Sequence, residues 1–149
     1  MDNNKIFVYG ILKRGYELDL EQFGAKFLGE ASIPGATLYG IGRRYQHEGH
    51  PNDGREFSGV GLKLAGSPLT TAYGELWEIP DNLWNFLDDI EQNGQVYERK
   101  IVPIVMNVPV PEDEIVPAGT YCKAYTNAWV YEHCFKNFHY KDIIVSGRF

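Results

Sequence analysis

Glu91 is the strongest candidate for chemistry in this sequence because its place on a predicted helix is unusual. Residues 82–91 carry apolar side chains at helical spacing, and Asp81 just before them is a good N-cap. On a wheel of about 100° per residue the apolar arc centres on Leu83, and Glu91 falls inside that arc. A carboxyl group on a buried face is costly unless it is paired or neutral, and burial raises its pKa. Such a group suits general acid–base catalysis.

Two side chains of the following strand are expected near Glu91. Tyr97 and Arg99 alternate along a predicted strand over residues 96–105, so they face the same side. The short connection through Asn93 and Gly94 returns this strand beside the helix end. Two simpler interpretations of Glu91 stay open: it frays into solvent as the last residue of the helix, or it pairs with Arg99.

Other reactive residue types form weaker patterns. Glu75, on an earlier predicted strand, is the rival catalytic carboxylate, although a structural or exposed role fits it better. His47 and His50 have a spacing that metal sites use, but no third ligand is near in the sequence. Cys122 and Cys134 form no CxxC motif and are expected to be buried thiols. We therefore expect neither a metal nor another cofactor.

The elements that would position these residues are mostly strands. Residues 18–28 have near-helical apolar spacing, weakened by Gly24, and residues 42–57 form a long polar excursion that suits a lid or rim. A short helix is expected between residues 133 and 143. The strands are predicted over residues 6–9, 37–39, 60–64, 71–79, 96–105 and 121–131. The fold class is α+β (mixed α/β), with a curved sheet or a partly closed barrel.

Length and composition restrict the classes of protein. The 149 residues predict a single domain over 1–149, and 44% hydrophobic with 23% charged residues is typical of a globular chain. A net charge of −6 disfavours binding to nucleic acid or to an anionic membrane. No run reaches the roughly 18 apolar residues of a membrane span, and the first residues do not read as a signal peptide. A reducing cytoplasm is the simplest compartment.

Four segments resemble, in order, motifs of the gamma-glutamylcyclotransferase-like (avirulence-induced-gene-like) superfamily. Residues 7–15, FVYGILKRG, resemble its VYGTLRxG opening, and residues 73–79, YGELWEI, resemble its strand of the form GE-aromatic-x-aliphatic. Residues 87–91 with 97–99, LDDIE followed by YER, are similar to its LDxxE…YxR block. Residues 143–149, IIVSGRF, resemble its usual I…GDW ending. The likeness extends along nearly the whole chain.

This resemblance implies a small β-barrel with short helices around it and one pocket. It implies that Glu91 is the catalytic acid–base and that the loop of Tyr9, Gly10, Ile11 and Leu12 holds a glutamyl group with backbone amides. The family reaction cleaves a γ-glutamyl amine or peptide: the substrate's own α-amine attacks its γ-carbonyl, releasing 5-oxoproline and a free amine. No protein nucleophile is needed. Tyr97 would line the pocket or donate a hydrogen bond to Glu91.

The sequence departs from the family pattern at three places. Ile11 stands where the family has Thr, and Arg148 and Phe149 stand where it has Asp and Trp. The polar stretch 42–57 is long. The expected partner is a small γ-glutamyl substrate, and the chain is expected to be a monomer or a homodimer. Two alternatives remain: a binding module on the same fold without turnover, and a protein-interaction domain that uses residues 42–57.

Overall fold

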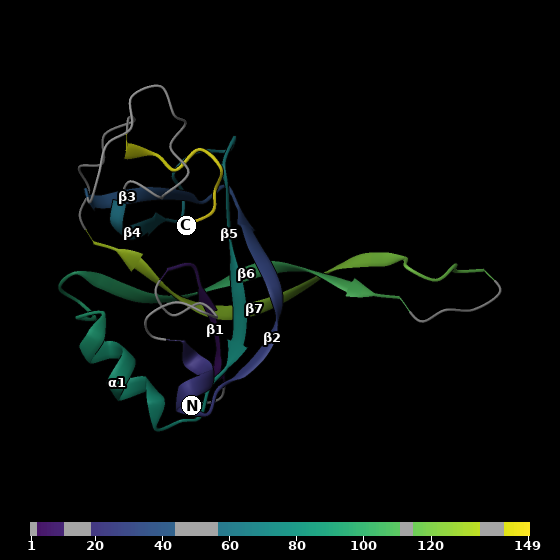
Figure 1. Cartoon of the computed structure of the whole chain (residues 1–149), viewed down its shortest axis with the longest axis horizontal. Helices are drawn as coiled ribbons and strands as arrows, with labels where there is room; N and C mark the ends of the chain where they lie inside the picture. Colours follow the sequence, from purple (N-terminus) through teal and green to yellow (C-terminus); the bar gives the residue numbers. More distant parts are fainter. Residues whose placement is uncertain (1–2, 11–18, 44–56, 111–114, 135–141) are drawn as a thin grey trace.

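The computed structural model describes residues 3–10, 19–43, 57–110, 115–134 and 142–149 (Figure 1). In this part of the chain, strands predominate and one α-helix flanks them. The elements, in chain order, are β1 (Lys5–Val8), the 3₁₀ turn η1 (Leu20–Phe23), β2 (Lys26–Pro34), β3 (Thr37–Arg43), β4 (Phe57–Lys63), β5 (Thr71–Glu78), α1 (Leu83–Ile90), β6 (Tyr97–Pro109) and β7 (Tyr121–His133).

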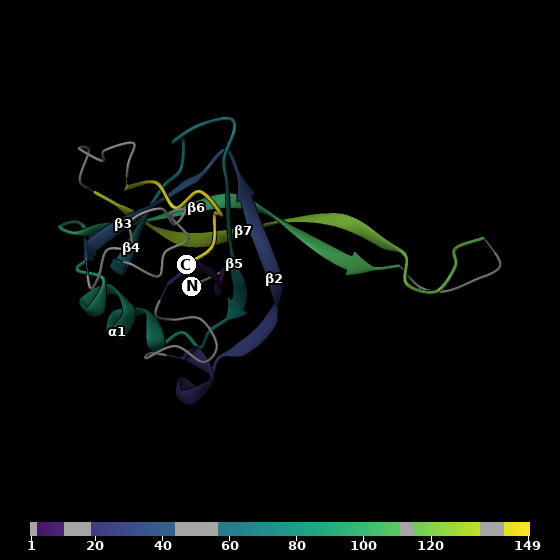
Figure 2. The same ribbon diagram turned by 45° about the horizontal axis from the view of Figure 1, so that its top comes forward.

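Five of these strands close into a barrel in the order β1-β5-β2-β6-β7. Neighbouring strands are antiparallel except at the closure, where β1 meets β7 in parallel through Ile6 and Trp129. The strands β3 and β4 form a separate two-stranded sheet beside the barrel, and α1 lies along another side (Figures 1 and 2). The predicted α+β class with a small mixed-sheet barrel is confirmed.

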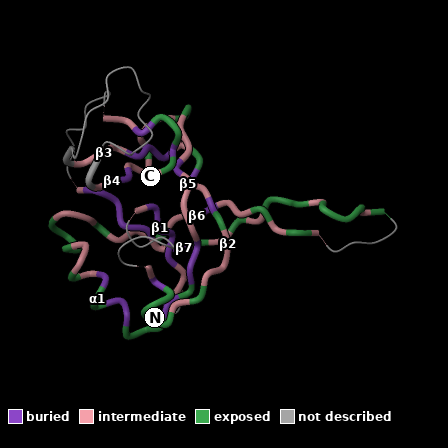
Figure 3. Tube along the Cα trace, in the orientation of Figure 1, coloured by how far each residue is buried: buried purple, intermediate pink, exposed green. Residues whose placement is uncertain are grey.

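The interior divides into two apolar clusters. One fills the barrel around Phe7, Leu76 and Ile104, and the other packs α1 against the barrel through Leu87 and Trp77. All five side chains are almost fully buried. Figure 3 shows buried segments converging on β1 and its neighbours. Because β1 lies between both clusters, the residues at its end are held on a rigid base.

The expectation of near-helical structure over residues 18–28 is wrong. Within the described residues of this segment, only Leu20–Phe23 form a helical turn, of 3₁₀ type, and β2 begins at Lys26. The cause is Gly24, whose left-handed φ of 84° ends the turn. Apolar side chains then continue at the strand period, with Ala31 and Ile33 both buried.

The helix prediction over residues 82–91 is nearly right, but its capping residue is wrong. α1 spans Leu83–Ile90, with Asn82 as N-cap and Glu91 as C-cap. The Asp81 carboxylate accepts a hydrogen bond from the side chain of Asn4 instead, and this bond is the main reason why its pKa is lowered. This bond therefore holds the N-terminal end of α1 to the start of β1, and Asp81 does not cap the helix.

The ends of β6 and β7 project from the barrel as a two-stranded arm (Figures 1 and 3). Its strands stay paired as far as Pro109 and Tyr121. Cys122 lies on this arm and is exposed, so the expectation that both cysteines are buried is wrong for it. Cys134 is partly buried. The sequence pattern missed this because alternation along a strand does not show where the strand leaves the core.

Other sequence expectations fall on segments that the structure does not describe. Residues 44–56, which include His47 and His50, lie outside the described residues, as do residues 135–141, where a short helix was expected. Among the described residues, no helix combines the length and the apolar character that crossing a membrane requires.

Candidate active site

Glu91 ends α1 and lines a cavity. It is the C-cap, its backbone N–H donates to Leu87 O at 2.9 Å, and the chain turns away at Gln92, whose φ is +49°. The side chain thus keeps the direction set by the last helical turn, which faces the barrel through Leu87. The cavity has a volume of about 260 Å³. The interpretation in which Glu91 frays into solvent is therefore wrong.

The structure brings several residues singled out in the sequence to this one cavity. Tyr9 and Gly10, at the end of β1, lie on its wall together with Glu91 and Tyr97. Ile11 and Leu12 lie outside the described residues. The remaining described lining residues, which sequence reasoning did not assign to the site, are Phe7, Val8, Gly59, Val60, Ile90, Tyr131 and Phe149.

Among these missed residues, Phe149 had a signal in the sequence, because it stands where the family has Trp. Tyr131 had none, since Trp129, which shares its parity on β7, does not line the cavity. Val60 comes from β4, in the separate sheet, and reaches the cavity only because that sheet packs beside the barrel. No local pattern encodes such a contact between sheets.

The cavity wall carries three tyrosines whose hydroxyl protons are already committed. Tyr97 Oη donates to Val60 O at 2.8 Å. Tyr131 Oη donates to Asp88 Oδ1 at 2.6 Å, and Tyr9 Oη donates to the carbonyl oxygen of Tyr131. A phenol has one proton, so each oxygen is left only with acceptor capacity. The expectation that Tyr97 lines the pocket is fulfilled, whereas its hydroxyl donates to Val60 rather than to Glu91.

The electrostatics of the cavity are dominated by burial. Burial raises the pKa of Glu91 from 4.5 to about 7. Burial first, and then the nearby charge of Glu91, raises the pKa of Tyr97. The same carboxylate contributes to the raised pKa values of Tyr9 and Tyr131. The four groups therefore form one electrostatic unit, in which the tyrosines stay neutral and Glu91 titrates near neutral pH.

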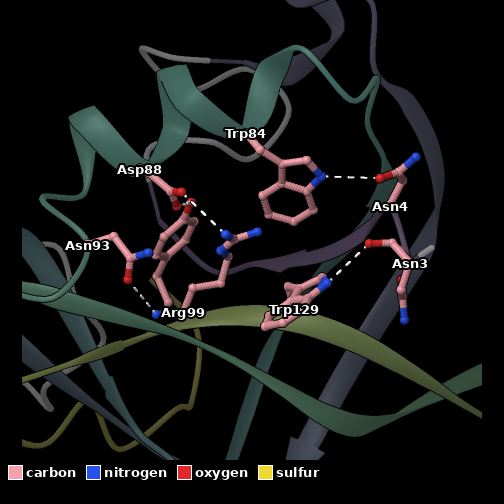
Figure 4. A network of polar contacts seen from close by, with 8 residues as sticks. Asn3, Asn4, Trp84, Asp88, Asn93, Arg99 and Trp129 are labelled. Atoms are coloured by element: carbon pink, nitrogen blue, oxygen red, sulfur yellow. Dashed lines mark hydrogen bonds and ion pairs between the residues drawn. The ribbon is translucent and has the colours of Figure 1, made fainter. Parts of the chain in front are cut away.

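Arg99 does not pair with Glu91, so that alternative is wrong. Its guanidinium lies against the rings of Trp84 and Trp129, with Cζ 4.5 and 4.8 Å from their centroids, and Nη2 lies 3.3 Å from Asp88 Oδ2 (Figure 4). Asp88 thus joins Arg99 to Tyr131 and holds α1 on the barrel. Arg99 is not among the cavity residues, and the predicted convergence holds only for Glu91 and Tyr97.

We expect Asp88→Asn to lower the free energy of unfolding by about 1–3 kcal/mol, because Arg99 would lose its charged acceptor at a mostly buried position. The side-chain oxygen of Asn can still accept from Tyr131. Denaturant unfolding at pH 7 measures the change. Asp89→Asn is the matched control, since Asp89 is exposed on the same helix and should shift stability by less than about 0.5 kcal/mol. Equal losses in the two variants would contradict this role.

Glu75, the rival carboxylate, is not among the described residues that line the cavity. Its Oε1 accepts a hydrogen bond from Trp77 Nε1 at 3.1 Å, and β1 residue Val8 is its partner across the strands. Among the described residues, no group of three or more His, Cys, Asp and Glu side chains has the arrangement of a metal site. Glu91 is therefore the one side-chain carboxyl among the described residues of the cavity wall.

A mixed five-stranded barrel, one flanking helix and a carboxyl group at the helix end, facing the tip of β1, define a small α+β barrel protein with an acid-bearing pocket. The family model described as "Gamma-glutamyl cyclotransferase, AIG2-like" matches residues 6–148, and the chain belongs to this family. A comparison with curated proteins finds no match.

Solved structures share the fold at low sequence identity. An uncharacterised protein from Pyrococcus horikoshii is 22% identical with a TM-score of 0.57, covering 97% of this chain and 88% of that one. An AIG2-like protein from Mus musculus is 20% identical with a TM-score of 0.57, covering 91% and 85%. A structure titled gamma-glutamyl cyclotransferase is 15% identical with a TM-score of 0.52, covering 87% and 68%. These similarities establish the fold.

Proposed function

We propose that this protein is a gamma-glutamyl cyclotransferase that acts on a small γ-glutamyl amine or peptide and releases 5-oxoproline and a free amine. The observation that carries the proposal is the Glu91 carboxyl, whose pKa is raised to about 7 in a cavity beside the end of β1. Family membership supports the reaction class. We assign Glu91 the role of general acid–base and Tyr9, Gly10, Ile11, Leu12 and Tyr97 the binding of substrate.

The reaction needs proton transfers that one carboxyl group can perform. The α-ammonium must lose a proton before its nitrogen attacks the γ-carbonyl carbon, since the protonated form is no nucleophile. The new C–N bond closes a five-membered ring, and the bond to the leaving nitrogen then breaks. Two protons leave the α-nitrogen and both end on the leaving amine, so Glu91 finishes in its starting state.

The committed tyrosine hydroxyls favour a substrate that carries an ammonium group. The oxygens of Tyr9, Tyr97 and Tyr131 can only accept hydrogen bonds, and Glu91 as carboxylate also accepts. This part of the wall would bind the α-ammonium and reject the α-carboxylate. Backbone N–H groups at the turn after β1 would hold the α-carboxylate or the oxyanion of the tetrahedral intermediate.

Mass spectrometry tests the function directly. The purified protein is incubated with a panel of γ-glutamyl amines and dipeptides, and 5-oxoproline is quantified against time. Release of 5-oxoproline from at least one compound, faster than in protein-free buffer, is the expected result. If a compound raises the melting temperature but is not consumed, the protein is a binding module instead. The feature that supports this second function is Ile11, which stands where the family has Thr.

The rate should depend on pH through Glu91. Because the base must be ionised, we expect kcat/KM to rise with pH below about 7 and to level off above that value. A carboxyl with its usual pKa would instead give a rate that has levelled off by about pH 5.5. Initial rates between pH 5 and 8.5, at constant ionic strength, separate the two. A rate that no longer changes above about pH 5.5 would show that Glu91 is not the base.

A further inference from the structure

A second hollow lies on the outer face of the barrel, away from Glu91. Its volume is about 350 Å³. One row of cross-strand neighbours forms its floor: Tyr73 on β5 is opposite Ser32 on β2, Ser32 is opposite Val105 on β6, and Val105 is opposite Tyr125 on β7. Directly opposed residues of a sheet share one face. The arm leaves the barrel beside this row (Figure 1), and the surface there is hollowed.

Two cations and one anion border the hollow. The guanidinium of Arg148 lies 4.2 Å from the centre of the Tyr73 ring, and Lys123 comes from the arm. Within the described part of the chain, neither cation has a carboxylate within 4.0 Å. Glu30 is the acidic side chain of the lining, so the described wall has a net positive charge in a chain whose net charge is −6. This contrast favours an anionic ligand.

The lining also indicates the shape of the ligand. The planar fork of Arg148 matches the two oxygens of a carboxylate, and Lys123 adds a second donor group. The rings of Tyr73 and Tyr125, at the two ends of this row, provide aromatic surface for a flat group, and the hydroxyl of Ser32 can donate between them. A small, flat carboxylate would use all of these groups.

The hollow is linked to the Glu91 cavity by two consecutive residues. Arg148 lines the hollow, whereas its neighbour Phe149 lines the cavity. Gly147 holds this segment in place, because its carbonyl oxygen accepts from Tyr73 N–H at 2.8 Å. Because Phe149 is the next residue, a ligand that moves the backbone at Arg148 would also move Phe149. We propose that this hollow is a second binding site, for a small flat carboxylate, whose occupancy is transmitted to the Glu91 cavity through Arg148 and Phe149.

Titration with sodium benzoate, followed by NMR of backbone amides and of the Phe149 ring, tests the proposal without any turnover. Benzamide, which has the same shape and no charge, is the control ligand. Benzoate is expected to shift the amides of Ser32, Tyr73 and Lys123 saturably and to shift the Phe149 ring with the same midpoint. Benzamide should leave them unchanged. Raised ionic strength should weaken benzoate binding.

Charge variants identify the site. Arg148→Gln and Lys123→Gln should each weaken benzoate binding about tenfold, and Glu30→Gln should strengthen it several-fold. Lys26→Gln is the matched control, because Lys26 is exposed on β2 and does not line the hollow. It should leave the affinity unchanged.

Specific results would overturn each part. Equal affinity for benzoate and benzamide would show that the hollow is not a carboxylate site. So would a loss of benzoate affinity in Lys26→Gln equal to that in Arg148→Gln. Tighter binding of inorganic phosphate than of benzoate would overturn the carboxylate class. Saturation without a shift of the Phe149 ring would overturn the connection. Since every readout is binding, the proposed enzymatic function can fail while this site stands, and the reverse also holds.

Discussion

Glu91→Gln is expected to lower the rate of 5-oxoproline release by about 10²–10⁴-fold, the usual contribution of general acid–base catalysis. The amide of Gln fits the space of the carboxyl group but cannot take a proton from the α-ammonium or return it to the leaving nitrogen. Single-turnover assays with the best compound of the γ-glutamyl panel measure the loss. Glu75→Gln is the control, since that carboxylate accepts from Trp77 and is not among the described residues of the cavity wall. Full activity in the Glu91 variant would end the proposed mechanism.

The same variant should be more stable than the wild type at high pH. The pKa of Glu91 is raised from 4.5 to about 7 in the folded protein, so the folded chain binds this proton more tightly than the unfolded chain. Ionisation of Glu91 therefore lowers stability as pH rises through that interval. Above pH 7 the Gln variant gains at most about 3 kcal/mol, and below about pH 4 the gain vanishes. Denaturant unfolding at pH 4, 6 and 8 measures it, and a gain independent of pH would contradict this cause.

Gly147→Ala is expected to lower the free energy of unfolding by at least about 3 kcal/mol and to disturb the cavity. Gly147 has a φ of +69°, which costs a residue with a side chain about 1–2 kcal/mol. In addition, a Cβ there would lie 2.1 Å from Thr71 O, and one of the two backbones must move. The movement breaks the hydrogen bond to Tyr73 and carries Phe149 away from the cavity. Thermal unfolding and KM for the γ-glutamyl substrate report the two effects.

Gly119→Ala separates backbone strain from the steric clash. Gly119 has a φ of +82°, but a Cβ added there would meet no atom within 4 Å. Backbone strain alone should therefore lower the free energy of unfolding, by about 1–2 kcal/mol. Its KM should equal that of the wild type. If Gly147→Ala and Gly119→Ala lose the same free energy of unfolding and have the same KM, the close packing of residues 142–149 on β5 does not contribute to stability or to the cavity.

The sequence was informative where a pattern is local. Helical spacing placed Glu91 among apolar residues, and strand alternation put Tyr97 one short connection away; both line the cavity. The same reasoning was wrong for residues 18–28, because one left-handed glycine converted an apparent helix into a turn and a strand. The alternative in which Glu91 pairs with Arg99 was also wrong, since Asp88 and Glu91 lie near each other in the sequence and periodicity does not tell which one faces Arg99.

The amino-acid sequence by itself determined the class of fold, the family and the acidic residue at the end of α1, because these depend on periodicity and on short motifs. Only the tertiary structure decided which side chains surround that acid. Val60 comes from a different sheet, Tyr131 from the far end of the chain and Phe149 from a segment held by β5. Barrel closure brings Tyr131 beside Tyr9, more than 100 positions away in the sequence. Val60 and Phe149 reach the cavity because the small sheet and the C-terminal segment pack against the barrel. The raised pKa of Glu91 is a consequence of that enclosure, because removing water from a carboxylate requires walls that no single segment provides.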